Sequence, residues 1–253
     1  MRWLIALVLL GVVACQTVPL TGRKQIMLVP EGDELKMGLE SYQQILGKSK
    51  VSADPRLAEQ VTRVGRRIAD ATERSDYQWE FRVIEDPQVN AFCLPGGKVA
   101  VYTGMLPVAR DDAGLAAVLG HEVSHAIARH GGERMSQELA VHGLTMASTQ
   151  ALLAGRDPGT VQLVSGVLGA GASVGLLLPW GRAQESEADH LGLIYMAKAG
   201  YHPSAARDLW VRMGEASKGN RPTAFLSTHP LPETRVTQIE GWMPEALKYY
   251  KPR

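Results

Sequence analysis

The sequence predicts an α+β protein that is mostly helical and carries one small β-sheet. Apolar residues recur at helical spacing over most of the chain, residues 79–83 alternate as in a strand, and residues 91–102 have the pattern of a hairpin. Hydrophobic residues make up 45% of the 253 residues and charged residues 21%, so the chain can bury a sizeable core and bulk disorder is excluded.

Composition also excludes some classes of function. The formal net charge is +1 and aromatic residues make up 6%, which argues against a nucleic-acid-binding protein, because such proteins need a basic footprint or a stacking platform. Two cysteines cannot form a disulfide scaffold. No pattern repeats with a period of about 20 to 50 residues, so a solenoid is excluded as well.

Residues 1–14 have the pattern of a signal peptide. One arginine precedes an apolar run that is shorter than the ~20 residues needed to cross a bilayer. The ending Val12-Val13-Ala14-Cys15 resembles a lipobox, in which the signal is cut before the cysteine and Cys15 is acylated. An ordinary signal cut elsewhere, or a buried N-terminal helix, is the alternative. Gln16, where retained inner-membrane lipoproteins carry aspartate, favours an outer-membrane lipoprotein that faces the periplasm.

Residues 15–30 are expected to form an irregular linker arm. Pro19, Gly22 and Pro30 break regular structure, and the basic segment TGRKQ is expected on the surface. Residues 31–253 are expected to form a single domain, because no linker divides them. This domain opens with two amphipathic helices, whose apolar residues stand at 35, 39, 42, 45 and 46 and at 57, 61, 64 and 68.

The predicted sheet follows these two helices. Residues 79–83 alternate apolar and polar side chains, and Asp86-Pro87 then turns the chain. Residues 91–94 and 97–102 flank the turn sequence Pro95-Gly96-Gly97, which predicts a small hairpin.

The rest of the chain is predicted to be helical. The expected helices span residues 111–130, 133–154, 184–199, 203–216 and 233–242, with a loop at 227–232. The segment from Val161 to Leu178 is apolar, and no charge occurs between Asp157 and Arg182. Its length alone makes it a transmembrane candidate.

Residues 121–125, His-Glu-Val-Ser-His, carry the clearest chemistry. Positions four apart share one face of a helix, so His121 and His125 can bind one ion while Glu122 projects toward the same cleft. This is the HExxH arrangement of zinc proteases. The alternative is a surface helix that carries two histidines by chance. Four further histidines lack partners at ligand spacing and are expected to be surface or capping residues: His130, His142, His190 and His202.

A catalytic zinc site needs a third protein ligand and leaves its fourth position to water. The segment Glu185-Ser186-Glu187-Ala188-Asp189 opens a later helix, and Glu185 and Asp189 share one face of it. One of them can bind metal while the other hydrogen-bonds a ligand histidine from behind. Glu187 points away from that face and is expected to be solvated. The alternative for Glu185 is a simple charge at a helix N-terminus.

The pairing of HEVSH with ESEAD resembles the gluzincin metallopeptidases that include HtpX, Oma and the CAAX prenyl proteases. TGRKQIMLVPE, NAFCLPGGKVAVYTGML and STHPLPETR resemble the periplasmic lipoprotein branch of that family, with BepA and LoiP. The resemblance implies a zincin-type peptidase fold and one Zn²⁺ per chain. It implies that His121, His125 and Glu185 bind the zinc, with Asp189 supporting a ligand and Glu122 as catalytic base. Unlike BepA, the sequence ends at Arg253 without room for a C-terminal repeat domain.

The zinc motif decides the expected topology of the segment from Val161 to Leu178. A single membrane crossing there would put His125 and Glu185 on opposite sides of the membrane, where one zinc could not join them. We therefore expect a buried helical element or hairpin packed through its small residues, or a segment that associates with a membrane surface or a partner.

A peptide substrate must lie extended across the site. The strand that contains Gly97, Val99, Val101 and Tyr102 is predicted to be a sheet edge on which the substrate pairs through backbone hydrogen bonds. The alternative is a hairpin with a purely structural role. Backbone pairing reads conformation more than side chains, which suits cleavage of unfolded or misassembled polypeptides.

His229 lies in the segment Ser227-Thr228-His229-Pro230, which prolines make stiff. The resemblance implies that His229 is a fourth zinc ligand that displaces water and keeps the enzyme latent. The alternative is a donor to the transition-state oxyanion, with Arg235 beside it.

Three hypotheses for the function follow. The first is a zinc endopeptidase for quality control of cell-envelope proteins, anchored to the membrane through Cys15. The second is a lipoprotein that binds misfolded proteins like a chaperone and rarely cuts them. The third is a structural zinc protein, but three protein ligands with room for water argue against the closed, four-coordinate sites typical of that class. The presence of Glu122 beside the metal motif favours the first.

Overall fold

The computed structural model describes residues 15–153, 157–172, 177–217, 223–230 and 234–252. The predicted signal peptide, residues 1–14, lies outside these ranges. The described chain is mostly helical with two small sheets, as expected from the sequence.

The main sheet has three strands, β3 (Glu80–Ile84), β4 (Ala91–Leu94) and β5 (Lys98–Tyr102). Their order is β3-β5-β4, with β3 parallel and β4 antiparallel to β5. The strand and the hairpin expected from the sequence are therefore confirmed. The prediction that Gly97, Val99, Val101 and Tyr102 line a sheet edge is wrong, because β5 lies in the middle with both sides paired.

The sheet edges are instead β3 and β4. A bridge between Val51 and Ile84 covers part of the outer side of β3. Among the described residues, β4 pairs only with β5, so its other side is an unpaired edge. The sequence could not reveal this order, because the parallel pairing of β3 with β5 joins strands that are not neighbours along the chain.

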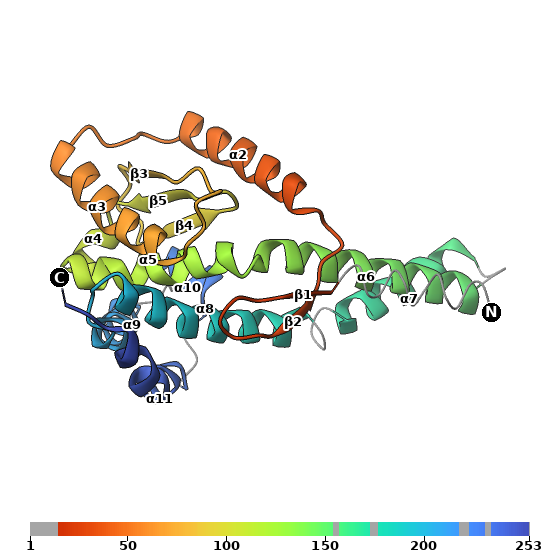
Figure 1. Cartoon of the computed structure of the whole chain (residues 1–253). Helices are drawn as coiled ribbons and strands as arrows, with labels where there is room; N and C mark the ends of the chain where they lie inside the picture. Colours follow the sequence, from red (N-terminus) through yellow and green to blue (C-terminus); the bar gives the residue numbers. More distant parts are fainter. Residues whose placement is uncertain (1–14, 154–156, 173–176, 218–222, 231–233, 253) are drawn as a thin grey trace.

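Helices lie on both sides of this sheet, and further helices extend beyond it (Figure 1). Two helices precede the sheet along the chain, α2 (Glu31–Lys48) and α3 (Pro55–Ala71). The helices that follow it are α4 (Met105–Ala109), α5 (Asp112–Ile127), α6 (His130–Leu152), α7 (Pro158–Ala172), α8 (Leu178–Lys198), α9 (Ser204–Ala216), α10 (Ala224–Thr228) and α11 (Arg235–Ala246), with a last 3₁₀ turn, η2 (Leu247–Tyr249). The first residues of α3 and α5 follow aspartates whose side chains accept hydrogen bonds from the free N–H groups of the first turn. Helix α2 lies on one side of the sheet and α3 and α5 on the other, and α8, α9 and α11 pack beyond α5.

Helices α5 and α8 form the centre of the molecule and touch through their backbones. A Cβ placed on Gly120 would lie 3.0 Å from the carbonyl oxygen of Gly192. In return, a Cβ on Gly192 would lie 3.0 Å from the backbone nitrogen of His121. Two glycines thus allow an approach that side chains would prevent, and this approach brings the HEVSH motif beside the helix that carries Glu185.

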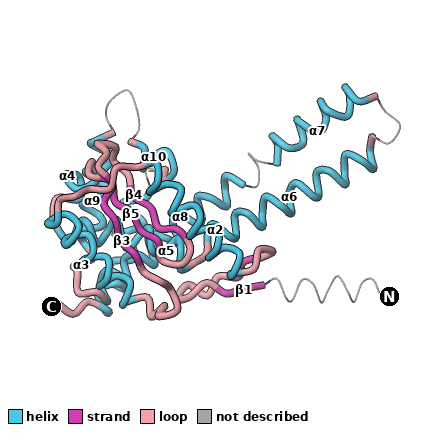
Figure 2. The backbone as a smooth tube through the Cα atoms, turned by 90° about the horizontal axis from the view of Figure 1, so that it is seen from above, coloured by secondary structure: helices cyan, strands magenta, loops and turns pink. Residues whose placement is uncertain are grey.

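Helices α6 and α7 form a hairpin that projects from the body of the molecule (Figure 2). Its apolar side chains are exposed, since Leu163 keeps 71% and Val167 68% of their surface. The expectation that Val161 to Leu178 is a buried element is therefore wrong for the described residues, and 173–176 lie outside them. No helix in the described part of the chain combines the length and apolar character that a membrane span requires.

Residues 15–30 do not form a loose linker. Strands β1 (Cys15–Thr17) and β2 (Lys24–Ile26) pair as an antiparallel hairpin that lies against α6. Val18 and Gln25 are buried, and the Gln25 side chain donates to the carbonyl of Ala128 at 3.0 Å. The expectation of an irregular arm is therefore wrong, although Gly22 and Lys24 of the TGRKQ segment are exposed as expected, and we call residues 15–26 the N-terminal hairpin.

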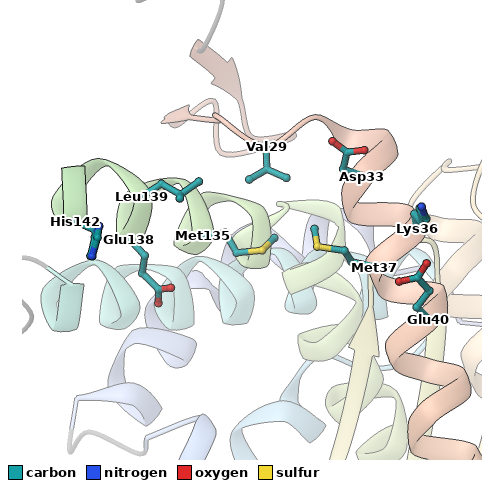
Figure 3. Close-up of a pocket in the computed structure, with 9 residues that line it drawn as sticks. All are labelled: Val29, Asp33, Lys36, Met37, Glu40, Met135, Glu138, Leu139 and His142. Atoms are coloured by element: carbon teal, nitrogen blue, oxygen red, sulfur yellow. The ribbon is translucent and has the colours of Figure 1, made fainter. Parts of the chain in front are cut away.

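A groove of about 740 Å³ lies between α2 and α6. Figure 3 shows Met37 and Met135 facing one another across it. Its lining also includes Val29, Asp33, Lys36, Glu40, Glu138, Leu139 and His142. None of the residues of the HEVSH motif belongs to this lining, so the groove is separate from the site described next.

Candidate metal centre

Helix α5 presents His121 and His125 on one face, as the four-residue spacing predicts. Their Nε2 atoms lie 3.2 Å apart. The His121 ring is buried and the His125 ring nearly so. The ring of His121 packs edge-on against Trp210 with centroids 5.5 Å apart. Two lone-pair-bearing nitrogens therefore converge on one point.

Helix α8 brings Glu185 to the same point. Its Oε2 lies 3.4 Å from Nε2 of His121, and its Oε1 lies 3.2 Å from Nε2 of His125. Glu185, rather than Asp189, is therefore the carboxylate that lies close to the Nε2 atoms of both histidines.

His229 completes the cluster from the segment after α10. Its Nδ1 lies 3.1 Å from Nε2 of His121 and 3.0 Å from Oε2 of Glu185. The ring packs on Phe225 with centroids 4.6 Å apart, and the backbone N–H of His229 donates to the carbonyl of Phe225. The short α10 therefore holds the imidazole in place.

Glu122 is buried next to the cluster. Its Oε1 lies 3.4 Å from Nε2 of His229 and has no hydrogen-bond partner among the described residues. The backbone N–H of Cys93 on β4 is near enough to this carboxylate to act to lower its pKa, which places the unpaired sheet edge at the site. Burial raises the pKa of Glu122, so the carboxyl holds a proton more readily than an exposed glutamate does.

The four residues fit a zinc ion by donor chemistry and spacing. His121, His125, Glu185 and His229 each offer one ligand atom, and these atoms lie within 4.8 Å of one another. Zinc binds nitrogen and carboxylate oxygen at ~2.0–2.2 Å, which places tetrahedral ligand atoms ~3.3 Å apart. The distances of 3.0–3.4 Å within the cluster match that spacing.

Behind His121, a carboxylate fixes which nitrogen faces the cluster. Nδ1 of His121 lies 2.9 Å from Oδ1 of Asp189, so an N–H there leaves Nε2 as a lone-pair donor. Arg235 donates hydrogen bonds to that carboxylate from Nε at 2.6 Å and from Nη2 at 2.8 Å. Its guanidinium lies 3.4 Å from the ring centroid of Trp210. Arg235 is buried in this contact, which differs from the expected place beside an oxyanion.

Behind His125, the path of hydrogen bonds to a carboxylate contains one more residue than the path behind His121, and it was not predicted from the sequence. Nδ1 of His125 lies 2.9 Å from Nδ1 of His130, and Nε2 of His130 lies 3.0 Å from Oε2 of Glu187. His130 has no exposed surface and Glu187 keeps only 8%. The expectations of a surface His130 and a solvated Glu187 are therefore wrong.

The break between α5 and α6 makes this contact possible. In an unbroken helix, residues five apart face about 140° away from one another. Arg129 has φ of 56°, in the left-handed region, and this residue ends one helix and starts the next. His130 is thereby turned back toward His125. The sequence predicted a break close by, between helices 111–130 and 133–154, but not the left-handed conformation at Arg129, which is not a glycine.

Residues 55–243 match the model of peptidase family M48. The chain belongs to that family. It is 39% identical over 235 residues to the mitochondrial metalloendopeptidase OMA1 of Schizosaccharomyces pombe, covering 90% of this chain and 66% of that relative. It is 28% identical over 248 residues to the beta-barrel assembly-enhancing protease of Escherichia coli K12, covering 94% of this chain and 50% of that relative. The chain thus spans between half and about two thirds of the length of these relatives.

Membership in family M48 makes the chain a metalloprotease with a zincin-type fold, as the motif predicted. The electrostatics of this M48 domain favour a cation at the centre of the cluster. Burial opposes a charge on His121, but hydrogen bonds to Asp189 and Glu185 raise its pKa to about 9. Burial also acts to raise the pKa of Glu185, but the three surrounding histidines lower it far below its usual range. The carboxylate is therefore held ionised, ready to face a positive ion.

Proposed function

We propose that this M48 domain is a zinc-dependent endopeptidase that cleaves unfolded or misassembled polypeptides of the cell envelope. The observation that carries the proposal is the convergence of His121, His125 and Glu185 beside a buried carboxyl, Glu122, at an unpaired sheet edge. A structural zinc site would have no use for such a carboxyl or for the neighbouring edge.

The roles of the side chains follow from their positions. Bound zinc supplies a positive charge that polarises the scissile carbonyl and lowers the pKa of a nearby water. Glu122 accepts the proton of that water and passes it to the leaving amine, and its burial keeps its pKa high enough for both transfers. His121, His125 and Glu185 hold the ion, and Asp189 keeps the lone pair of His121 directed at it.

The corrected sheet edge supports the proposed type of substrate. Strand β4 presents its unpaired side next to Glu122, so an extended peptide could add to β4 through backbone hydrogen bonds. Only a chain segment free of its own secondary structure can pair in this way. The preference for unfolded polypeptides thus rests on the free edge of β4 in place of the β5 residues proposed from sequence.

The test of the proposed activity is digestion of casein, an unstructured substrate, by the purified protein and its Glu122→Gln variant. Digestion by the wild type should stop when a chelator removes zinc and resume when zinc is restored. Digestion that resists the chelator, or that the variant performs equally well, would refute the zinc mechanism. Binding of casein without any cleavage would favour the chaperone-like alternative.

Replacing His229 with alanine is expected to raise basal casein cleavage while zinc stays bound. His229 Nδ1 lies 3.1 Å from Nε2 of His121 and 3.0 Å from Glu185, so its side chain occupies the place that water and substrate would need. Initial rates and zinc content of the wild type and variant are the measurements. If His229 is instead an oxyanion donor, kcat should fall by ~10²–10³-fold with KM unchanged.

The envelope location rests on the sequence of the first 16 residues, and a relative named as mitochondrial shows that family members work in other compartments. Cys15 is exposed at the start of β1, so its position is compatible with an acyl anchor. We expect Cys15→Ser to shift the protein from the membrane fraction to the soluble fraction after cell lysis. A variant that stays with the membranes after its signal has been removed would point to the exposed apolar α6–α7 hairpin as the anchor instead.

A further inference from the structure

The N-terminal hairpin reaches the metal cluster through a partly buried network of polar and charged side chains. Arg23, between β1 and β2, donates from Nε to Oε2 of Glu187 at 2.8 Å. Thr21 donates to the other oxygen of Glu187 at 2.5 Å. The hydroxyl and the guanidinium thereby fix both oxygens of the carboxylate whose Oε2 meets His130.

The direction of the hydrogen bonds along this path follows from the cluster. If Nε2 of His125 faces the ion, its Nδ1 carries the proton and donates to Nδ1 of His130. His130 then holds its own proton on Nε2 and donates it to Glu187. One arrangement of protons therefore satisfies every member, and it ends on a carboxylate that the N-terminal hairpin holds.

The two ligand histidines of α5 are supported in parallel ways. Arg235 and Asp189 stand behind His121, whereas Arg23 and Glu187 stand behind His125 with His130 inserted between them. Both carboxylates belong to α8, two residues apart, so they leave that helix on opposite sides. The first arginine comes from α11 and the second from the N-terminal hairpin.

We propose that Arg23, with Thr21, is a positioning residue of the zinc site, and that the N-terminal hairpin thereby sets how tightly the M48 domain holds its metal. The proposal rests on the proposed zinc-peptidase function. Groups behind metal-ligating histidines typically change metal affinity by ~10–100-fold when they are removed. Arg23 acts through Glu187 and His130, so we expect its effect at the lower end of that range.

The chain provides a matched control for this network. Arg23 also donates from Nη1 and Nη2 to Glu133 at 2.6 and 2.8 Å, and Glu133 is as buried as Glu187. Glu133 accepts a hydrogen bond from Gln184, and among the described residues no hydrogen bond joins its side chain to that of His130. Replacing Glu133 removes a buried ion pair of the same arginine and leaves the path to His125 in place.

The experiment measures the zinc affinity of the purified full chain by competition with a chromogenic chelator. Arg23→Gln and Thr21→Val should each raise the Kd for Zn²⁺, by ~10-fold for the arginine, and Glu187→Gln by ~10–100-fold. The Kd of Asp189→Ala shows how much affinity is lost when the corresponding carboxylate behind His121 is removed. Glu133→Gln should bind zinc as the wild type does, even where its thermal stability falls. The visible absorption of Co²⁺-loaded protein should shift in Arg23→Gln and not in Glu133→Gln.

A double-mutant cycle separates positioning from general loosening of the fold. In a His130→Gln background, Arg23→Gln should cause no further loss of affinity, because the path is already cut. Folded Arg23→Gln and Thr21→Val proteins with wild-type affinity and Co²⁺ spectrum would overturn the inference while leaving the zinc-peptidase proposal intact. Equal losses in Glu133→Gln and Arg23→Gln would overturn it too. A wild type that binds no zinc would refute the proposed function itself.

Discussion

Glu122→Gln is expected to lower kcat for casein digestion by ~10²–10⁴-fold, the usual contribution of a positioned acid/base group. Glutamine keeps the shape of the side chain, but it cannot take up and release a proton. Zinc content should stay at the wild-type level, because Glu122 is not among the four clustered ligand groups. Initial rates and metal analysis of the same preparations are the measurements.

Ser124→Ala is the control within the same motif. The hydroxyl of Ser124 donates to the carbonyl of Gly120 at 2.6 Å and faces no member of the cluster, so its loss should change the rate by less than tenfold. If Glu122→Gln digests casein at the wild-type rate, another group must move the proton, and the assignment of Glu122 fails.

Glu185→Ala is expected to abolish zinc binding and, with it, all chelator-sensitive cleavage. A catalytic zinc site needs three protein ligands, and Glu185 is the carboxylate that lies within 3.4 Å of both His121 and His125. Asp189→Ala leaves all three in place and should only weaken binding, by ~10–100-fold. Metal content after extensive dialysis distinguishes the two variants. Full occupancy in Glu185→Ala would mean that the third ligand lies elsewhere.

The sequence predicted best what depends on local spacing. A helix places residues four apart on one face, so the HEVSH spacing alone was enough to pair His121 with His125. The hairpin was equally local, because Gly96 and Gly97 both take positive φ, 84° and 80°, which few other residues adopt. Strand pairing and the α5–α8 contact depend on distant parts of the chain, so the edge role of β5 was predicted wrongly.

The supporting residues of the site were predicted only where they shared a face with a ligand. Asp189 stands four residues from Glu185, and helical spacing indicated that one of the two binds metal while the other supports a ligand. Glu187 projects from the other side of α8, where the usual expectation for a charge is solvent, but the N-terminal hairpin and His130 cover it. Exposure of α7 was missed for a related reason: apolar composition shows what a segment can bury, and the fold decides whether a partner surface is there.

The backbone contact of Gly120 with Gly192 makes motion at the metal cluster asymmetric. Contacts between side chains can relax when a rotamer changes, but a contact between two main chains cannot. Helices α5 and α8 can therefore move apart in thermal motion but hardly closer together. The main-chain contact sets the smallest distance between His121 on α5 and Glu185 on α8. An increase in that distance is resisted by the side chains packed around the two helices. Thermal fluctuations of the metal cluster should therefore increase the distance between the ligand groups on α5 and α8 more readily than they decrease it.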